Sequence, residues 1–519
     1  MEYNDFVVMI DQQLQIKAEE RLPHGAVNPV NGPLESFQDS KLLKQRKQII
    51  EAITSMIYQE DDQQDLIKQF GRNLFDELFK GSIRNSFRNA LNVARDARPP
   101  RGLRIRLQLP SELQMLPWEL MFRADEEAEH FLCRNPAITL VRSKRTVGRA
   151  AALPISLPLM ILVIIATPLN HIPLDTRKEI DHLLSSLATL IREGKVQIDF
   201  VHGADTLKKI RSRLQNQNYH ILHLIGHGEK EGDTIYLVLE DQYRQAHRIT
   251  PENLYFALQV VSLPRLVFLN MCQGAVASAK FPITSIAESF LRADIPAVIA
   301  HQFEISDDAA STIAKHLYEK LSEGSPVEEA LALARFEAAL QLPSPIESFT
   351  PVLFLYYETG HLFSVNLTSP LLSPQCDRLM EEARSAINAQ RWSEATDYVQ
   401  EILVIKPDDG EVKELHSQTL KEERLDIFLH EASFLERMAA ERSHLAERLN
   451  YLRGAVDWYE KYLSHPFAAN RPSFELKRIA QLKQTAQTEL DRLILFERLK
   501  QQVPQVVVGV SDPWLKWRG

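Results

Sequence analysis

The chain has few cysteines, and none of them is spaced for metal binding. Its 519 residues include three cysteines, Cys133, Cys272 and Cys376, far apart in the sequence. No CxxC motif and no Cys/His metal pattern occurs, so we expect no structural zinc, no other metal and no cofactor. A sparse, odd number of cysteines is typical of a reducing cytoplasm, where a lone thiol can act as a nucleophile.

The chain also lacks an excess of basic residues and a long apolar run. Its 60 Lys and Arg against 69 Asp and Glu give a net charge of −9, which predicts no direct nucleic-acid partner. The most hydrophobic stretch, LMILVIIAT at 159–167, is too short for a membrane span of about 20 residues and predicts a central buried strand. The opening MEYNDFVVMIDQ has no signal-peptide pattern, so we expect a cytoplasmic protein with no membrane partner.

The length suggests two or three domains, and the composition divides the chain into four segments. Residues 1–38 read as a polar lead-in of limited order, and 39–150 as helices at 39–60 and 62–95 followed by strands. Residues 151–368 alternate strands and helices, which predicts an α/β core with a mostly parallel sheet flanked by helices. Residues 375–519 form an all-α region, in which Ala383, Ala395 and Pro407 match one tetratricopeptide-like hairpin.

Local patterns give more detailed expectations. LRIRLQLP at 103–110 alternates, which predicts a half-buried strand with its leucines inward and its arginines outward. Asp205 is a candidate helix cap, and Ser325-Pro326-Val327-Glu328 matches a capping box. PVLFLYY at 351–357 is expected to close the sheet, and the apolar, aromatic tail VVVGVSDPWLKWRG to dock on the body or on a partner.

Two apolar runs end on reactive side chains. NYHILHLIGHG closes on His227 and Gly228, and RLVFLNMCQGA closes on Cys272. In open α/β sheets, ligands bind where the carboxyl ends of strands meet loops, so neighbouring strands would bring the imidazole beside the thiol. This arrangement predicts Cys272 as a nucleophile, His227 as its base, and the backbone N–H groups of Gly228 and Cys272 as oxyanion donors.

Other polar residues near these strands have ordinary structural interpretations beside the functional one. His223 lies four residues before His227 and either lines the site or is a hydrogen-bonded core histidine. Asn270 either lines a substrate pocket or satisfies nearby backbone, and Glu304 and Asp307 are further pocket candidates. With its neighbours, Asp307 more simply caps the next helix.

The sequence resembles the CHAT family of caspase-like cysteine peptidases, from the clan that includes caspases, metacaspases and separase. The resemblance runs from about 65 to 365 and includes GRNLFDELF, LRIRLQL, LPWEL, HLIGHG, LNMCQG and PAVIAHQFEISDDAA. It implies a caspase-hemoglobinase fold and peptide-bond hydrolysis by His227 and Cys272, with Gly228 at the oxyanion position. Metacaspases, which cleave after Arg or Lys, carry aspartate where this chain has Asn270, so that source of basic-residue preference is missing.

CHAT proteins in bacteria are commonly linked to antiphage defence and regulated cell death, where they cleave a partner such as a gasdermin. The resemblance therefore implies a regulated endopeptidase with a protein substrate, such as a gasdermin-like effector, and a regulatory or sensor protein that docks on the C-terminal helices. Two alternatives remain open. One is a catalytically silent caspase-like interaction scaffold, and the other is a thiol hydrolase of small amides, for which a closed, deep pocket would be expected.

Overall fold

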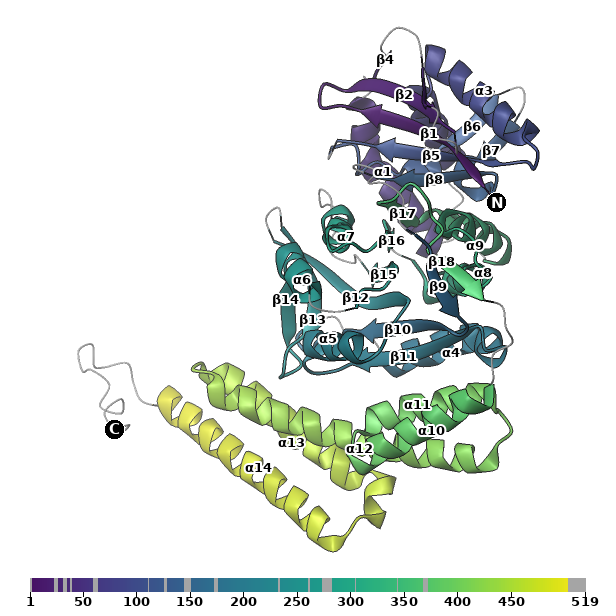
Figure 1. Cartoon of the computed structure of the whole chain (residues 1–519). Helices are drawn as coiled ribbons and strands as arrows, with labels where there is room; N and C mark the ends of the chain where they lie inside the picture. The colour runs from purple at the N-terminus through teal and green to yellow at the C-terminus, as the bar shows by residue number, and fades with distance from the viewer. Residues whose placement is uncertain are drawn as a thin grey trace. The chain divides into compact units, whose positions relative to one another are not determined.

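A computed structural model shows two compact units, which we describe separately (Figure 1). The first comprises residues 1–378 and 404–407, and the second comprises residues 379–403 and 408–519. The structure describes residues 2–22, 27–30, 35–37, 40–58, 64–110, 112–125, 128–143, 151–171, 176–231, 234–259, 262–272, 282–303, 305–342, 344–366 and 372–502.

The first unit is built on a 14-stranded sheet whose core half is mostly parallel. Its strands are joined through helices, as expected when apolar runs buried on both faces alternate with amphipathic segments. The core strands lie in the order β11 (Val196–His202), β10 (Leu159–Ile165), β12 (Ile221–Glu231), β15 (Leu266–Cys272), β16 (Ala297–His301) and β17 (Pro351–Leu355). Within this series all neighbours are parallel except β16 and β17, which pair antiparallel. The predicted α/β architecture is confirmed.

The sheet continues beyond β17, which the sequence analysis expected to close it. β17 also pairs with β8 (Ile138–Arg142), and β5 (Gly102–Gln108), β1 (Tyr3–Ile10), β2 (Gln15–Arg21) and β3 (Val27–Pro29) follow. The expectation of a poorly ordered lead-in was therefore wrong for residues 3–21, which form β1 and β2. β1 is buried between β5 and β2, and its Phe6 and Val8 belong to the N-terminal core.

Helices cover both faces of the core sheet. α4 (Thr176–Arg192), α8 (Asp307–Ser322) and α9 (Val327–Gln341) pack on one face, and α5 (Thr206–Asn216), α6 (Pro251–Leu258) and α7 (Pro282–Arg292) on the other. α1 (Ser40–Tyr58), α2 (Gln64–Leu78) and α3 (Gly81–Asp96) pack on the N-terminal strands. The remaining strands are β4 (Glu35–Ser36), β6 (Phe122–Asp125), β7 (Ala128–Phe131), β9 (Leu153–Ser156), β13 (Thr234–Glu240), β14 (Ala246–Ile249) and β18 (Phe363–Asn366).

Three local predictions were wrong. The helix expected over 62–95 is two helices, because the chain turns at Lys80 and Gly81, where Gly81 has a φ of +44°. Asp205 precedes α5, but its backbone is left-handed and its side chain makes no capping bond. The proposed capping box also fails, since Pro326 directly precedes α9 without a side-chain cap, and Glu328 is buried in an ion pair instead.

That ion pair belongs to a buried network on β5. Arg104 and Arg106, expected to face solvent, are 6% and 0% exposed and both bind Asp5 of β1, with Nε–Oδ distances of 2.5 and 2.9 Å. Arg104 also pairs with Glu328 of α9, and both guanidinium groups donate to the Glu358 carbonyl. Burial alone would lower the pKa of Arg104, but Glu328 and Asp5 raise it above its usual value, so the cation is retained.

The second unit is helical, as the sequence predicted. Its helices are α10 (Leu372–Asn388, which begins in the first unit), α11 (Trp392–Ile405), α12 (Gly410–Glu441), α13 (Leu445–Ser464) and α14 (Ser473–Gln502). Ala383 and Ala395 of the predicted hairpin are fully buried. The apolar tail lies outside the described residues.

Two histidines in the core of the first unit are expected to make it sensitive to acid. Both His223 and His301 are almost fully buried, and this burial lowers the pKa of each ring to about 3. Below pH about 6.5 the two imidazoles become protonated in the unfolded chain but stay neutral in the folded chain. The free energy of unfolding is therefore highest above this pH and decreases as the pH falls below it. We expect a loss of roughly 1.4 kcal/mol per pH unit for each ring.

Urea denaturation between pH 7.5 and 5 measures this loss. A His223→Gln variant, which removes one of these titrating rings, should show a shallower pH dependence than the wild type whatever its stability at pH 7.5. Part of the slope should remain, because burial also lowers the pKa of His301 to about 3 and that of His220 to about 4. A free energy of unfolding that stays constant over this range would contradict the assignment.

Candidate active site

The strand register places His227 opposite Cys272. β12 and β15 are adjacent and parallel, and Gly226 pairs with Met271 and His227 with Cys272. Cys272 is the last residue of β15, and His227 is the residue at which the parallel pairing of β12 ends. Both positions therefore lie at the carboxyl edge of the parallel sheet, where binding sites form. Since residues in register on parallel strands share a face of the sheet, positions 227 and 272 share one.

The sequence analysis expected β12 to end at His227, but the strand continues to Glu231. On one side of β12, the neighbouring strand changes from β10 to β13 at this point. Ile225 pairs with Ile165 at the end of β10, and from His227 to Glu231 the strand pairs with the antiparallel β13. The chain leaving β10 must therefore turn away from the sheet beside Gly226. A Cβ atom at Gly226 would lie 3.3 Å from the Ala166 carbonyl oxygen, so this passage is tight.

The segment that leaves β10 brings a second histidine onto His227. The rings of His171 and His227 are stacked, with centroids 4.3 Å apart and an interplanar angle of 30°. Hydrogen bonds to the β13–β14 hairpin hold this segment: Leu169 N–H donates to the Arg244 carbonyl at 2.8 Å, and Ala246 N–H to the Asn170 side-chain oxygen at 2.7 Å. His171 is thus fixed in place by its neighbours in sequence.

A carboxylate and a guanidinium complete this cluster. Nε2 of His171 lies 2.8 Å from Oε1 of Glu229, which shares the His227 face of β12 because it is two residues further along the strand. Glu229 Oε2 lies 2.5 Å from Nε of Arg248 on β14. His227 is 5% exposed, so its imidazole lies in a polar but largely water-excluded environment. Sequence analysis missed His171, Glu229 and Arg248. These residues come together only because β12 pairs first with β10 and then with β13, which no local sequence pattern indicates.

The other candidate residues have mixed outcomes. His223 is a core histidine whose Nδ1 lies 2.8 Å from the Tyr318 hydroxyl, and burial raises the pKa of that hydroxyl well above its usual value. Asn270 is half-buried on β15, at the position paired with Ile225. Asp307 lies in the first turn of α8, capped by Ser306, and its carboxylate is 3.4 Å from Lys178. Glu304 lies outside the described residues.

Gly228 follows His227 on β12. Among the described residues, a Cβ atom built at Gly228 would meet nothing closer than the Tyr236 carbonyl oxygen at 4.0 Å. These residues do not require glycine at this position, so the missing side chain leaves room beside them for a bound group.

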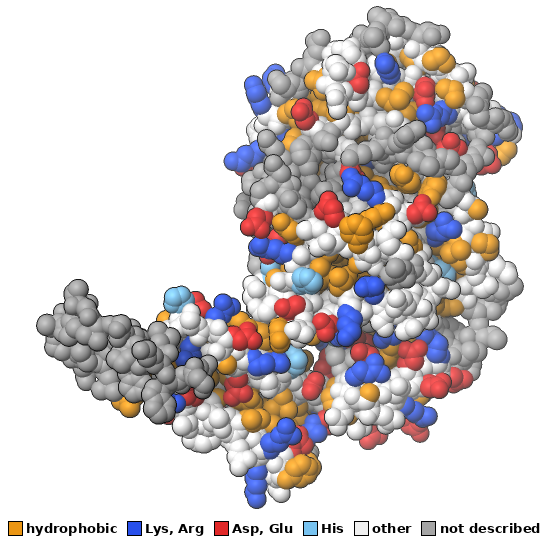
Figure 2. All heavy atoms as spheres, turned by 60° about the vertical axis from the view of Figure 1, so that its left-hand side comes forward, with side chains coloured by type: hydrophobic (Ala, Val, Ile, Leu, Met, Phe, Trp, Pro, Cys, Tyr) orange, Lys and Arg blue, Asp and Glu red, His pale blue; other side chains and the backbone are white. Residues whose placement is uncertain are grey.

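The described part of the chain gives no sign of another kind of centre. Its residues hold no cluster of His, Cys, Asp or Glu that could bind a metal. Among the same residues, no helix is both long and apolar enough to cross a membrane. On the face shown in Figure 2, acidic and basic side chains are interspersed, without a continuous basic patch among the described residues. Cys133 is a buried core residue, and burial raises the pKa of its thiol to about 11.

The first unit is thus an α/β protein with a mostly parallel, helix-flanked sheet, in which a histidine and a cysteine occupy paired positions on adjacent strands. The CHAT domain family model matches residues 68–347, more than half of the chain, so the protein belongs to the CHAT domain family. This confirms the resemblance noted from its motifs.

Two solved structures are similar to parts of this chain. One is the Arg-specific cysteine proteinase gingipain R, with 12% identity, a TM-score of 0.34, and coverage of 60% of this chain and 77% of that one. The other is a secreted C11 cysteine protease from Bacteroides thetaiotaomicron, with 11% identity, a TM-score of 0.26, and coverage of 43% and 70%. No curated protein sequence matches this chain significantly.

Proposed function

We propose that this chain is a cysteine endopeptidase that cleaves a protein partner with His227 and Cys272 as its catalytic dyad. The observation that carries the proposal is the register of β12 and β15, which sets these two positions side by side. Membership of the CHAT family supports the same reaction class. The proposal needs no metal or cofactor, since a thiol and a base suffice for acyl transfer.

The proposed reaction has two stages. His227 accepts the thiol proton, and the Cys272 thiolate attacks the scissile carbonyl carbon to form a tetrahedral oxyanion. The backbone N–H groups of Gly228 and Cys272 are the proposed donors to that oxyanion. Collapse breaks the C–N bond as His227 returns its proton to the leaving amine, and a thioester remains. Water, deprotonated by His227, then hydrolyses the thioester and regenerates the thiol.

The proposed substrate pocket includes Asn270, whose uncharged amide does not select for a basic side chain through an ion pair. We place the activity in the cytoplasm, in antiphage defence or programmed cell death. A gasdermin-like effector is the proposed protein substrate, and a regulatory or sensor protein docks on the helices of the second unit. Membership of the CHAT family supports this biological context. A regulatory partner is proposed because unregulated proteolysis is toxic to the cell.

Cleavage mapping tests the proposed function even though the substrate is unidentified. The full chain is incubated with a lysate of its own host, and new amino termini are identified by mass spectrometry, in parallel with a Cys272→Ala variant. The proposal predicts a small set of cuts present only with the wild-type chain. Identical termini in both samples, together with a full biological effect of the variant, would favour the silent scaffold instead.

We further predict that His171 positions His227 and stabilises its protonated form. Its ring stacks on His227, and its Nε2 is bound to the Glu229 carboxylate, so negative charge lies close to the imidazolium that forms during the reaction. His171→Ala should lower kcat about 10- to 100-fold, the range typical of supporting residues around a reactive centre. His171→Phe keeps the stacked ring without the link to Glu229, and should restore part of kcat.

The pH profile separates this role from a merely structural one. Without His171, the Glu229 carboxylate loses the ring that holds it beside His227 and can turn toward Arg248. Less negative charge then faces the imidazolium, so the pKa of His227 in the profile should fall. A profile unchanged in both variants would show that His171 only fills space.

A further inference from the structure

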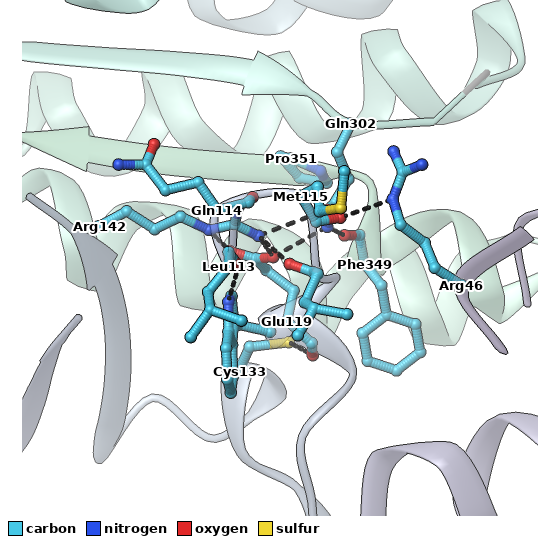
Figure 3. A network of polar contacts seen from close by, with 12 residues as sticks. Arg46, Leu113, Gln114, Met115, Glu119, Cys133, Arg142, Gln302, Phe349 and Pro351 are labelled. Carbon is cyan, nitrogen blue, oxygen red and sulfur yellow. Dashed lines mark hydrogen bonds and ion pairs between the residues drawn. The ribbon is translucent and has the colours of Figure 1, made fainter. Parts of the chain in front are cut away.

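A buried network of hydrogen bonds joins the N-terminal strands to Gln302, the residue that follows β16 (Figure 3). Its centre is Glu119 of the LPWEL segment, which lies in a 3₁₀ turn, η1 (Trp118–Leu120). The Glu119 carboxylate pairs with Arg142 at the end of β8, and both side chains are almost fully buried. Gln302 connects this ion pair to the core sheet.

The Gln302 side chain bonds to both charges of the pair. Its Oε1 accepts from Nη2 of Arg142 at 3.2 Å, and its Nε2 donates to Oε2 of Glu119 at 2.9 Å and to the Phe349 carbonyl at 3.0 Å. An amide can accept from a guanidinium and donate to a carboxylate at once, which neither a carboxylate nor an ammonium can do. The Gln302 N–H also donates to the Thr350 carbonyl at 2.8 Å, so side chain and backbone are both held.

The Glu119 carboxylate is itself firmly placed. Trp118 is fully buried, and its Nε1 donates to the Leu113 carbonyl at 2.8 Å. The Cys133 thiol donates to the Glu119 carbonyl at 3.0 Å. Because η1 is fixed by these bonds, the ion pair gives Gln302 a rigid support.

Gln302 begins the connection between β16 and α8, of which the structure describes residues 302–303 and 305–306. The last registered pair of β15 and β16 is Leu269 with Ala300, so Gln302 lies two residues beyond this pair and Cys272 three. Adjacent strands are about 4.8 Å apart, so both residues lie at the same part of the carboxyl edge.

The connection also lies on the face of the sheet that carries the proposed dyad. Alternate residues of a strand share a face, so His227 lies on the face of Ile225 and Cys272 on that of Phe268. Ile225 and Phe268 belong to the core cluster beneath α4, α8 and α9, and so does Ile305 of the connection. The connection is therefore placed to contact a chain that is bound at these two side chains.

A second carboxylate holds the other end of the connection. Oε2 of Glu347, on the 3₁₀ turn η3 (Pro345–Phe349), accepts from the Ser306 N–H at 2.6 Å, and Glu347 is almost fully buried. Buried groups thus hold the connection at its first and last residues. Such support from behind is what keeps a binding loop in its productive shape.

We propose that Gln302 is a positioning residue for the proposed active site. Held by Glu119 and Arg142, it fixes the connection in the conformation that binds the substrate chain beside Cys272. Gln302 acts through the connection and not on the reacting atoms, so its loss should weaken substrate binding more than it slows the chemical step. This inference rests on the proposed peptidase function, and it gives the LPWEL segment a part in cleavage.

Gln302→Met tests the proposal, because it removes the amide, keeps the length of the side chain and leaves the Glu119–Arg142 pair in place. With a peptide substrate taken from the cleavage mapping, we expect KM to rise about 10- to 100-fold and kcat to stay within about threefold of the wild type. The pH dependence of Cys272 alkylation by iodoacetamide should be unchanged, since the dyad is intact.

Gln114→Met is the matched control. Gln114 is a buried glutamine of the same region, but its amide donates to the Leu109 carbonyl and not to the connection, so this variant should keep the wild-type KM. If Gln302→Met fails to fold, Gln302→Asn makes the same comparison, because its amide is too short to reach both charges.

Hydrogen exchange of the full chain follows the connection without a substrate. In the Gln302 variant, peptides covering 302–309 should exchange about tenfold faster, whereas those of β10 should keep their wild-type rates. An unchanged KM, unchanged exchange in 302–309, or faster exchange throughout the first unit would overturn the inference. A wild-type chain that cleaves nothing would instead contradict the proposed function, and the exchange rates would still show whether Gln302 holds the connection.

Discussion

Replacing Cys272 by alanine is expected to lower the rate of peptide-bond cleavage by at least about 10⁴-fold, the range seen when a nucleophile or its base is removed from such a site. The substitution deletes the attacking sulfur, and no other cysteine replaces it, since Cys133 and Cys376 are both buried. His227→Ala should have an effect of the same order, because the thiol then lacks its proton acceptor.

The two substitutions should not be additive. Groups that act as one unit lose nearly all of their effect with the first removal, so the double variant should be no slower than either single variant. Cys376→Ala is the matched control and should keep wild-type kcat. Substantial cleavage by Cys272→Ala, measured with a peptide substrate taken from the mapping experiment, would show that another nucleophile does the work.

Glu328→Ala is expected to destabilise the first unit by about 3–5 kcal/mol, the usual cost of breaking a buried ion pair from one side. Glu328 is 2% exposed, and its loss leaves the guanidinium groups of Arg104 and Arg106 with Asp5 as their only carboxylate among the described residues. Glu337→Ala on the solvent side of the same helix should change stability by about 0.5 kcal/mol or less. Urea denaturation compares the three chains.

A second substitution, at a glycine beside Glu328, is expected to disturb the same network of buried ion pairs. A Cβ atom at Gly360 would lie 1.5 Å from Oε2 of Glu328, closer than any real contact, so Gly360→Ala must displace the carboxylate. We expect a destabilisation of the same sign and order as for Glu328→Ala. A Glu328→Ala variant as stable as the wild type would show that the N-terminal strands do not depend on this pair.

The core of the fold could be predicted from the sequence because its strands are strongly patterned. The apolar runs at 159–167, 221–226 and 266–269 are buried on both faces, so their composition alone marks them as central parallel strands. The reactive ends of two of these runs then identified His227 and Cys272 as neighbours, since adjacent strands in such a sheet share an edge.

The errors arose where tertiary contacts overrode a local pattern. LRIRLQLP reads as half-buried, but carboxylates from β1 and α9 neutralise its arginines, so both faces of the strand are inside. Residues 3–21 read as a polar lead-in, but they complete the sheet beside β5. His171 belongs to no recognisable sequence motif. Its ring stacks on His227 only because β13 replaces β10 as the partner of β12 at that point.

The central claim is that the Cys272 thiol and the His227 imidazole act on each other. The rate of Cys272 alkylation by iodoacetamide, followed as a function of pH by mass spectrometry, measures this directly, because only the thiolate reacts. The account predicts an inflection well below the usual thiol pKa of about 8.5 in the wild-type chain, and a return toward 8.5 in His227→Ala. An inflection near 8.5 in both chains would contradict it.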